Sequence, residues 1–177
     1  MLTNSLLTCK LETPLGTMLA AAGTGANAGK AALCGLWFIG QKYFPKDSES
    51  WLSRPEFPLF LELGTWIDGY FSKSKNLPCL SLAPCGTPFQ LSVWKQLIEI
   101  PCGTTCTYGG IAKKLKGETN NPVFVRAVAG AVGRNPISLI IPCHRVIGSD
   151  GTLKGYAGGI ERKMALLELE GIKTGAA

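Results

Sequence analysis

Two kinds of segment are missing from this chain, and both absences narrow its class. No apolar run reaches the roughly 18 residues that a membrane span needs, so we expect no transmembrane segment and no membrane partner. The stretch Met1–Lys10 has neither a basic region nor a sustained apolar region, and it therefore does not resemble a signal peptide. We expect a cytosolic protein, or a nuclear one in a eukaryotic cell.

Motifs for nucleotides and for metals are also absent. The chain has no GxxxxGK(S/T) loop and no GxGxxG turn after a strand, so the sequence does not support nucleotide binding. It holds 1 histidine, and its 7 cysteines lack the CxxC pairs of zinc ribbons. An odd number of cysteines without an export signal also argues against a disulfide framework. We expect no cofactor and no metal.

The chain does have an excess of positive charge, and this excess is unevenly spread. Its 177 residues, 46% hydrophobic and 17% charged, are typical of a globular protein with one domain or two small ones. Residues 1–85 hold 7 Lys+Arg and 6 Asp+Glu, whereas residues 86–177 hold 11 and 6. The net charge of +6 therefore arises mostly in the second half. A polyanionic partner is expected there.

The pattern of the first half predicts a small α/β unit. Strands are expected at Leu6–Glu12, Thr17–Ala22 and Ala31–Phe38, with a turn at Gly23–Gly29. An apolar repeat at three and four residues predicts a helix over Pro58–Phe71. Residues 78–88 hold three prolines and a glycine, which suit no regular element. The sequence therefore predicts a supporting domain over residues 1–85 and a second domain over residues 86–177.

The second domain is predicted to be mainly helical. Helices are expected at Phe89–Ile100, at Tyr108–Leu115, from Pro122 to about Val132, and at Glu161–Glu170. The middle two helices are joined at Gly117–Asn121, with Asn121 as a candidate N-cap, and they predict a helix-turn-helix. An apolar strand at Leu139–Ile141 and a hairpin around Gly148–Gly151 should precede the last helix, which Gly171 ends. The fold class expected is α+β, with a winged-helix-like second domain.

One predicted helix has an unusually smooth face. At about 100° per residue, Ala129, Gly130 and Gly133 lie within about 60° of Arg126. The opposite side is apolar, with Phe124, Val125, Val128, Ala131 and Val132. Such a helix could approach a DNA groove closely without reading its sequence, because it lacks long polar side chains. The alternative is a buried helix whose small residues allow tight packing.

The stretch Ile141–Val146 holds the residues with the most reactive chemistry. It contains Cys143, His144 and Arg145, and His144 is the only histidine. A cysteine becomes a nucleophile as its thiolate, which a nearby base and positive charge favour. Neighbouring side chains of an extended chain point to opposite sides, so we expect a bridging water between Cys143 and His144. The alternative is a buried cysteine beside a hydrogen-bonded core histidine.

Ordered motifs over about Gly86–Gly171 resemble those of the O6-alkylguanine-DNA alkyltransferases, the methylated-DNA–protein-cysteine methyltransferases. The motifs are Thr87-Pro88-Phe89-Gln90 with Val93-Trp94, Thr107-Tyr108-Gly109, Arg126-Ala127-Val128, Gly133-Arg134-Asn135-Pro136, Ile141-Pro142-Cys143-His144-Arg145-Val146, and Gly155-Tyr156-Ala157-Gly158-Gly159. Residues 1–85 match only in layout. The resemblance implies DNA repair by transfer of a methyl or small alkyl group from O6-alkylguanine, and from O4-alkylthymine, to a cysteine that is consumed.

The resemblance also implies roles for individual residues. Cys143 would accept the alkyl group, His144 would draw off its proton through a water, and Glu170 would orient His144. The residue pattern of the last helix does not by itself favour Glu170 over Glu168 for this role. The other implied catalytic residues are Asn135, which would brace a turn, and Tyr108, which would push on the phosphate or assist protonation of the leaving guanine. The DNA-binding residues implied are Arg126, which would fill the gap left by the flipped nucleotide, and Ala127, Ala129, Gly130, Arg134 and Tyr108.

The implied pocket for the flipped base shows departures from the family pattern. It would be formed by Val146, Tyr156, Ala157, Gly158, Ser138 and Arg145. Ala157 replaces a serine of many relatives, and Ser138 stands where some have proline, which could alter the alkyl size accepted. Some relatives bind zinc in the first domain with Cys and His ligands, but this chain has no histidine there.

The expected partner is double-stranded DNA bound largely without sequence specificity. We expect a monomer, with cooperative binding along DNA as an open alternative. Three other functions remain: a lesion-binding protein without catalysis, a cysteine hydrolase, and a transcriptional regulator. The presence of Cys143 argues against the first. The smooth helix with its basic surroundings argues against the second, and the lack of base-reading side chains argues against the third.

Overall fold

The computed structural model describes residues 6–24, 31–74, 79–117 and 121–173. The chain separates into two compact units, residues 1–85 and 86–177, which is the division that the prolines of residues 78–88 predict. Among the described residues, no helix is long and apolar enough to cross a membrane.

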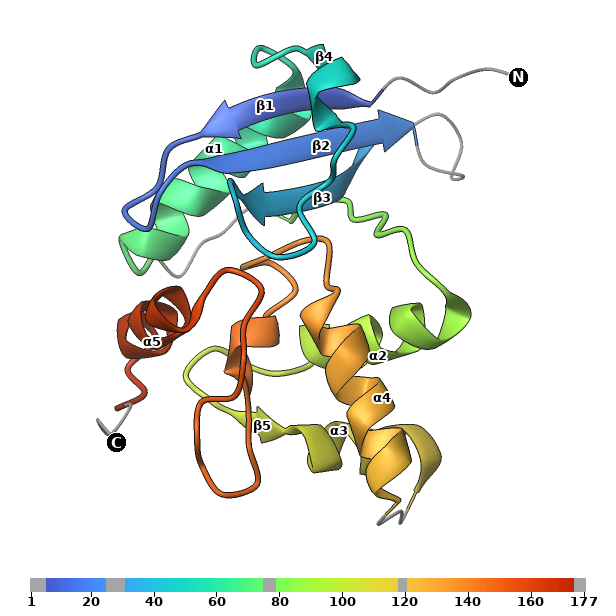
Figure 1. Ribbon diagram of the computed structural model, residues 1–177. Helices are drawn as coiled ribbons and strands as arrows, with labels where there is room; N and C mark the ends of the chain where they lie inside the picture. Colours follow the sequence, from blue (N-terminus) through green and yellow to red (C-terminus); the bar gives the residue numbers. More distant parts are fainter. Residues whose placement is uncertain (1–5, 25–30, 75–78, 118–120, 174–177) are drawn as a thin grey trace. The chain divides into compact units, whose positions relative to one another are not determined.

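A four-stranded sheet forms the centre of the first unit, in the order β3-β2-β1-β4 (Figure 1). Its strands are β1 Leu7–Leu11, β2 Met18–Thr24, β3 Ala31–Phe38 and β4 Leu52–Ser53. β1 and β3 run antiparallel to β2, and the short β4, which the sequence did not predict, runs parallel to β1. The turn expected at Gly23–Gly29 lies mostly outside the described residues.

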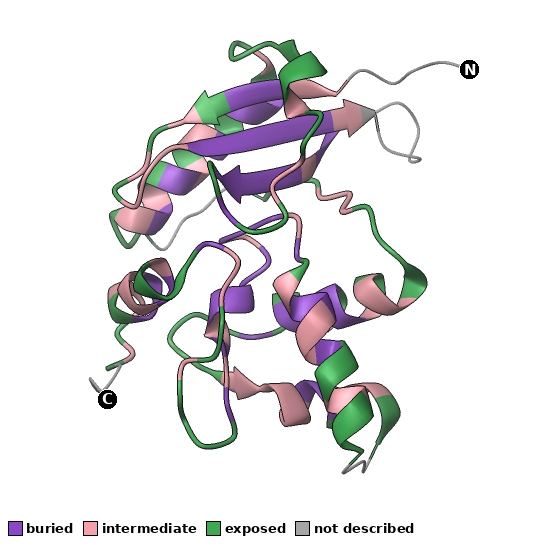
Figure 2. Ribbon diagram, in the orientation of Figure 1, coloured by how far each residue is buried: buried purple, intermediate pink, exposed green. Residues whose placement is uncertain are grey.

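Helix α1, Pro58–Phe71, supplies the apolar cover of this unit. Its buried residues follow the three- and four-residue repeat and are Leu59, Phe60, Leu63, Ile67 and Tyr70. The helix lies behind the sheet in Figure 1 and packs on β3, and Figure 2 shows β2 and β3 as largely buried. A short 3-10 turn, η1 Ser48–Ser50, precedes β4. The predicted bounds of α1 and β3 are confirmed.

Three mutually packed helices form most of the second unit: α2 Pro88–Ile98, α3 Tyr108–Lys116 and α4 Pro122–Gly133. Each begins at a residue whose side chain accepts hydrogen bonds from free backbone N–H groups of the first turn, namely Thr87, Thr107 and Asn121. At α2, Thr87 and Gln90 bond each other's backbone reciprocally. The predicted helix pair α3–α4 is present, although residues 118–120 of its turn lie outside the described residues.

The remainder of the second unit positions the predicted reactive residues. A 3-10 turn, η2 Cys143–Arg145, leads into β6 Val146–Ile147, which pairs in parallel with β5 Cys106–Thr107. Helix α5, Ile160–Leu169, ends with Gly171 at φ +83°, as predicted for a helix terminator.

The strand predicted at Leu139–Ile141 is wrong. This segment is a series of tight turns, in which Ile141 N donates to Ile137 O and Leu139 has a φ of +69°. Apolar composition alone cannot make a strand, which needs a partner for its backbone groups. The predicted hairpin at Gly148–Gly151 is a turn closed by Gly148 N donating to Thr152 O, with no second strand among the described residues that follow it. The winged-helix expectation stays a prediction.

Candidate active site around Cys143

Cys143 begins the η2 turn and is almost completely buried, with 6% of its surface exposed. The amide of Asn135 donates to its sulfur, with Nδ2 3.1 Å from Sγ. Burial raises the pKa of the Cys143 thiol, because a thiolate loses its hydration there. The Asn135 amide, Lys163 and backbone N–H groups act in the opposite direction on this pKa. The resting group is therefore a protonated thiol surrounded by groups that stabilise its anion.

Asn135 also holds the backbone that carries Cys143. Its Nδ2 donates to Ile141 O at 2.7 Å and to Ile137 O at 3.3 Å, while its Oδ1 accepts from Ile137 N at 3.0 Å. One buried side chain thus takes the place of the strand partner that this segment lacks. Because Asn135 lies two residues after Gly133, the last residue of α4, it ties the end of that helix to the turn of the cysteine.

His144 is fully buried, and its Nε2 lies 2.8 Å from Glu170 Oε1. A carboxylate can only accept, so Nε2 carries the proton and Nδ1 presents its lone pair. Burial lowers the pKa of His144, and the carboxylate of Glu170 opposes this only in part. The imidazole is therefore neutral near pH 7, as a base must be.

Glu170 is the carboxylate at this site, and Glu168 is exposed on the same helix. Arg145 holds Glu170 by two hydrogen bonds, with Nε 2.8 Å from Oε2 and Nη2 2.8 Å from Oε1. Its Nη1 donates to Ile100 O at 2.6 Å. The guanidinium of Arg145, expected in the base pocket, is thus engaged in positioning the carboxylate.

Lys163 is a buried cation that sequence reasoning missed. It has 0% of its surface exposed, and its Nζ donates to Val146 O at 2.6 Å and to Lys154 O at 2.9 Å. Burial lowers its pKa to about 8, and the charge of Cys143 acts against this shift. Its burial could have been predicted from its position three residues before Leu166, which places it on the apolar side of α5.

Two tyrosines lie within electrostatic reach of Cys143. The hydroxyl of Tyr156 is buried, and its pKa is raised well above the usual value by burial and by Cys143, with Ser138 acting to lower it. Tyr108 is the first residue of α3, and burial and Cys143 raise its pKa as well. Both hydroxyls therefore keep their protons at neutral pH and can donate. Of the other expected pocket residues, Val146 is buried, and the carbonyl of Gly158, next to Ala157, accepts from Arg162.

The outer side of α4 is solvent-facing at the residues expected to meet DNA. Arg126, Ala127 and Arg134 are exposed, and Ala129 and Gly130 are partly exposed. Val128, Ala131 and Val132 form the buried side. The alternative of a wholly buried helix is therefore wrong.

The family model described as "6-O-methylguanine DNA methyltransferase, DNA binding domain" matches residues 88–172. The methylated-DNA–protein-cysteine methyltransferase of Methanosarcina mazei is 47% identical over 135 residues, which cover 76% of this chain and 82% of that protein. The corresponding protein of Mycobacterium leprae is 41% identical over 160 residues, 90% of this chain and 89% of its own length.

The chain belongs to the methylated-DNA–protein-cysteine methyltransferase family. The crystal structure of Mycobacterium tuberculosis OGT in complex with DNA agrees, at a TM-score of 0.80 and 38% identity, with 93% of each chain covered. The mixed α and β fold expected from the sequence is thereby confirmed. The enzyme class is that of the family, in which an alkyl group carried by DNA is transferred to a cysteine of the protein.

Proposed function

We propose that this methyltransferase removes a methyl or small alkyl group from O6-alkylguanine in double-stranded DNA and places it on Cys143 in a single turnover. The observation that carries the proposal is the buried chain of contacts around Cys143: Asn135 on its sulfur, and the next residue, His144, bonded to Glu170. O4-alkylthymine, whose alkyl group sits on a comparable exocyclic oxygen, is proposed as a second substrate. The protein is proposed to act as a monomer in the cytoplasm, or in the nucleus of a eukaryotic cell.

The target carbon lies inside a stacked duplex, so the nucleotide must first be flipped out, at a cost of a few kcal/mol. Arg126 projects from α4 beside small residues and takes the vacated place in the stack. The smooth neighbourhood at Ala129 and Gly130 lets the helix approach the groove without base-specific contacts, which accounts for binding of low sequence specificity. Tyr108 at the start of α3 meets the displaced nucleotide.

In the transfer step, His144 Nδ1 takes the Cys143 proton through an intervening water, and Sγ attacks the alkyl carbon. A C–S bond forms as the C–O6 bond breaks, and the electron pair leaves with guanine. The departing guanine takes up one proton, for which the hydroxyl of Tyr108 is the candidate donor, and is released neutral. The proton held by His144 returns to Tyr108 through water, so the net change is transfer of the Cys143 proton to guanine. Lys163 and the amide of Asn135 favour the thiolate. Because the thioether product is not hydrolysed, each protein molecule reacts once.

The test is mass spectrometry after incubation with duplex DNA containing O6-methylguanine. We expect one methyl group on the peptide that contains Cys143, and no reaction in a Cys143→Ala variant that still binds DNA. An unmodified protein, or repeated turnovers without modification, would contradict the mechanism.

A second variant tests nucleotide flipping. Arg126→Ala should slow transfer from the duplex more than transfer from free O6-methylguanine base, because the free base needs no flipping. Single-turnover rates on the two substrates measure the difference, and equal slowing on both would contradict the role given to Arg126.

A further inference from the structure

A short turn over residues 156–159 leads from Tyr156, which is within electrostatic reach of Cys143, to helix α5. Gly159 N donates to Tyr156 O at 3.0 Å, and this backbone hydrogen bond closes the turn. Gly159 is also the N-cap of α5, with a φ of +94°, and it has no side chain that could cap the helix. Helices α2, α3 and α4 each begin at a capping side chain. The start of α5 therefore needs another contact to fix its backbone.

Arg162 supplies this contact from the first turn of α5. Its Nη1 donates to Gly158 O at 2.8 Å, and Gly158 is buried. The carbonyl of Gly158 and the N–H of Gly159 belong to one planar peptide group, in which they point in opposite directions. Tyr156 O holds the N–H, and Arg162 holds the carbonyl. A rotation of this peptide group would break both hydrogen bonds, so the orientation of the turn depends on Arg162.

Helix electrostatics do not explain the position of Arg162. The helix dipole disfavours a cation in the first turn of a helix, whereas it favours the acidic Glu161 of the same turn. The charge of Arg162 instead reaches Tyr156. Burial raises the pKa of Tyr156, and the charge of Arg162 acts to lower it. The guanidinium of Arg162 is therefore linked to the 156–159 turn by its charge as well as by its hydrogen bond.

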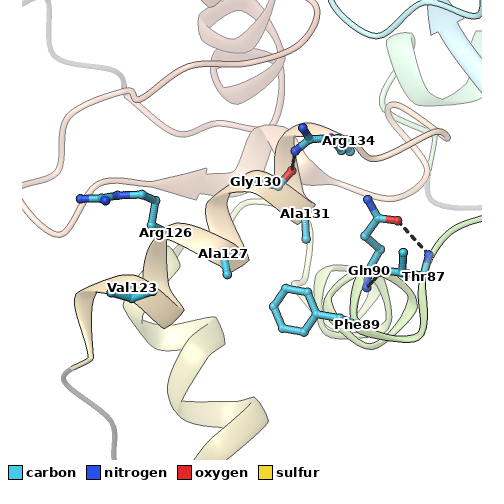
Figure 3. Close-up of a pocket in the computed structure, with 9 residues that line it drawn as sticks. All are labelled: Thr87, Phe89, Gln90, Val123, Arg126, Ala127, Gly130, Ala131 and Arg134. Atoms are coloured by element: carbon cyan, nitrogen blue, oxygen red, sulfur yellow. Dashed lines mark hydrogen bonds between the residues drawn. The ribbon is translucent and has the colours of Figure 1, made fainter.

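Arg134 makes a hydrogen bond of the same kind on the exposed side of α4. Its Nη1 donates to Gly130 O, four residues earlier, at 3.2 Å (Figure 3). Gly130 lies inside α4, where helical hydrogen bonds already fix the backbone, and Arg134 is exposed. Gly158, by contrast, is buried and precedes its helix, so it lies outside the helical hydrogen bonds of α5. Of the two arginines, Arg162 is thus the one whose bond positions a backbone segment.

We propose, building on the proposed function, that Arg162 is a positioning residue of alkyl transfer. Through Gly158 O it holds the 156–159 turn in place while the flipped base lies against this turn. Tyr156 and Ala157 of the turn are residues expected in the base pocket. A turn displaced by about 1 Å would misplace the alkyl carbon relative to the sulfur of Cys143, and such a misplacement lowers the rate strongly. Arg162 acts through the turn and not on the reacting atoms.

Arg162→Met tests this role, because methionine keeps an unbranched apolar stem and removes both the donor and the charge. We expect the maximal single-turnover rate of methyl transfer to fall about tenfold, on lesion duplex and on free O6-methylguanine base alike, since both substrates use the pocket. The DNA concentration that gives half of the maximal rate should stay the same. Arg162→Lys should recover most of the loss, because its ammonium group can donate to Gly158 O.

Arg54→Met is the matched control, because Arg54 is an exposed arginine of the first unit. It should leave the rate on both substrates unchanged. The fraction of protein methylated at the end of the reaction, measured by mass spectrometry, separates positioning from folding. If Arg162 contributed to stability alone, Arg162→Met would lower the melting temperature and this fraction, and the rate constant of the molecules that react would not change.

Three results would overturn the inference: an unchanged rate constant in Arg162→Met, a loss confined to duplex DNA, or a loss that Arg162→Lys does not reduce. Failure of the unaltered protein to accept a methyl group from either substrate would instead contradict the proposed function. The two failures are therefore distinguishable.

Discussion

Among single residues, Lys163 is a lysine whose whole side chain is buried. Its ammonium group is fully buried and donates to two neutral carbonyls, and no carboxylate of the described residues forms an ion pair with it. Such burial costs stability, and it lowers the pKa of Lys163 to about 8. The charge gains a partner when Cys143 ionises. We infer that Lys163 serves the thiolate rather than the resting fold.

Lys163→Met should therefore raise the pKa of Cys143 and slow alkyl transfer, by about tenfold for each pH unit of the pKa change. Transfer from free O6-methylguanine base, followed against pH, separates this effect from DNA binding. Lys154→Met, which removes a half-exposed lysine, is the control and should leave this rate unchanged. An unaltered pH profile in Lys163→Met would contradict the inference.

At the scale of elements, α4 is held at both ends by side chains. Asn121 Oδ1 accepts from Val123 N at 2.9 Å at its start. Near its end, Trp94 Nε1 of α2 donates to Ala131 O at 2.9 Å. Close packing of this indole requires Gly86, since a Cβ there would lie 2.5 Å from the ring. Helix α4 is thus fixed just before Asn135 and the cysteine turn.

Asn121→Ala should lower the free energy of unfolding by about 1 kcal/mol, because it removes the N-cap of α4. Asn121→Asp restores the cap and adds a charge that the helix dipole favours, so its stability should be close to that of the unaltered protein. Urea denaturation at pH 7 measures both. Equal loss in the two variants would show that the cap is not the cause.

For the whole molecule, the single histidine makes acid sensitivity traceable to one group. The pKa of His144 is about 6.5 in the unfolded chain and is lowered in the folded protein. The unfolded chain therefore binds a proton at this residue more readily than the folded protein does. Its contribution to stability is therefore complete above pH 6.5 and is lost as pH falls toward the folded pKa.

We expect the free energy of unfolding to decrease between pH 6.5 and 5, with a slope of at most about 1.4 kcal/mol per pH unit from this group. His144→Gln should flatten the profile in this window, since no other side chain has an ordinary pKa there. Urea denaturation at several pH values supplies the measurement. A slope unchanged in the variant would assign the effect to other groups.

Features that depend on neighbours in the chain were predictable. The caps Thr87, Thr107 and Asn121 act on N–H groups two or three residues away, and the motif around Cys143 is contiguous. The last helix and its terminator Gly171 follow from the same local rules. The sequence by itself therefore determined the helices and the division into two units, and it supplied Cys143 as the candidate nucleophile.

Contacts between distant residues were decided only by tertiary structure. The choice of Glu170 over Glu168 depends on which carboxylate meets a histidine 26 residues earlier. The turns at residues 137–142 replace the predicted strand because Asn135 satisfies their backbone. Burial of Lys163 against Val146 O likewise follows from packing. These outcomes arise from long-range hydrogen bonding and desolvation, which local sequence does not encode.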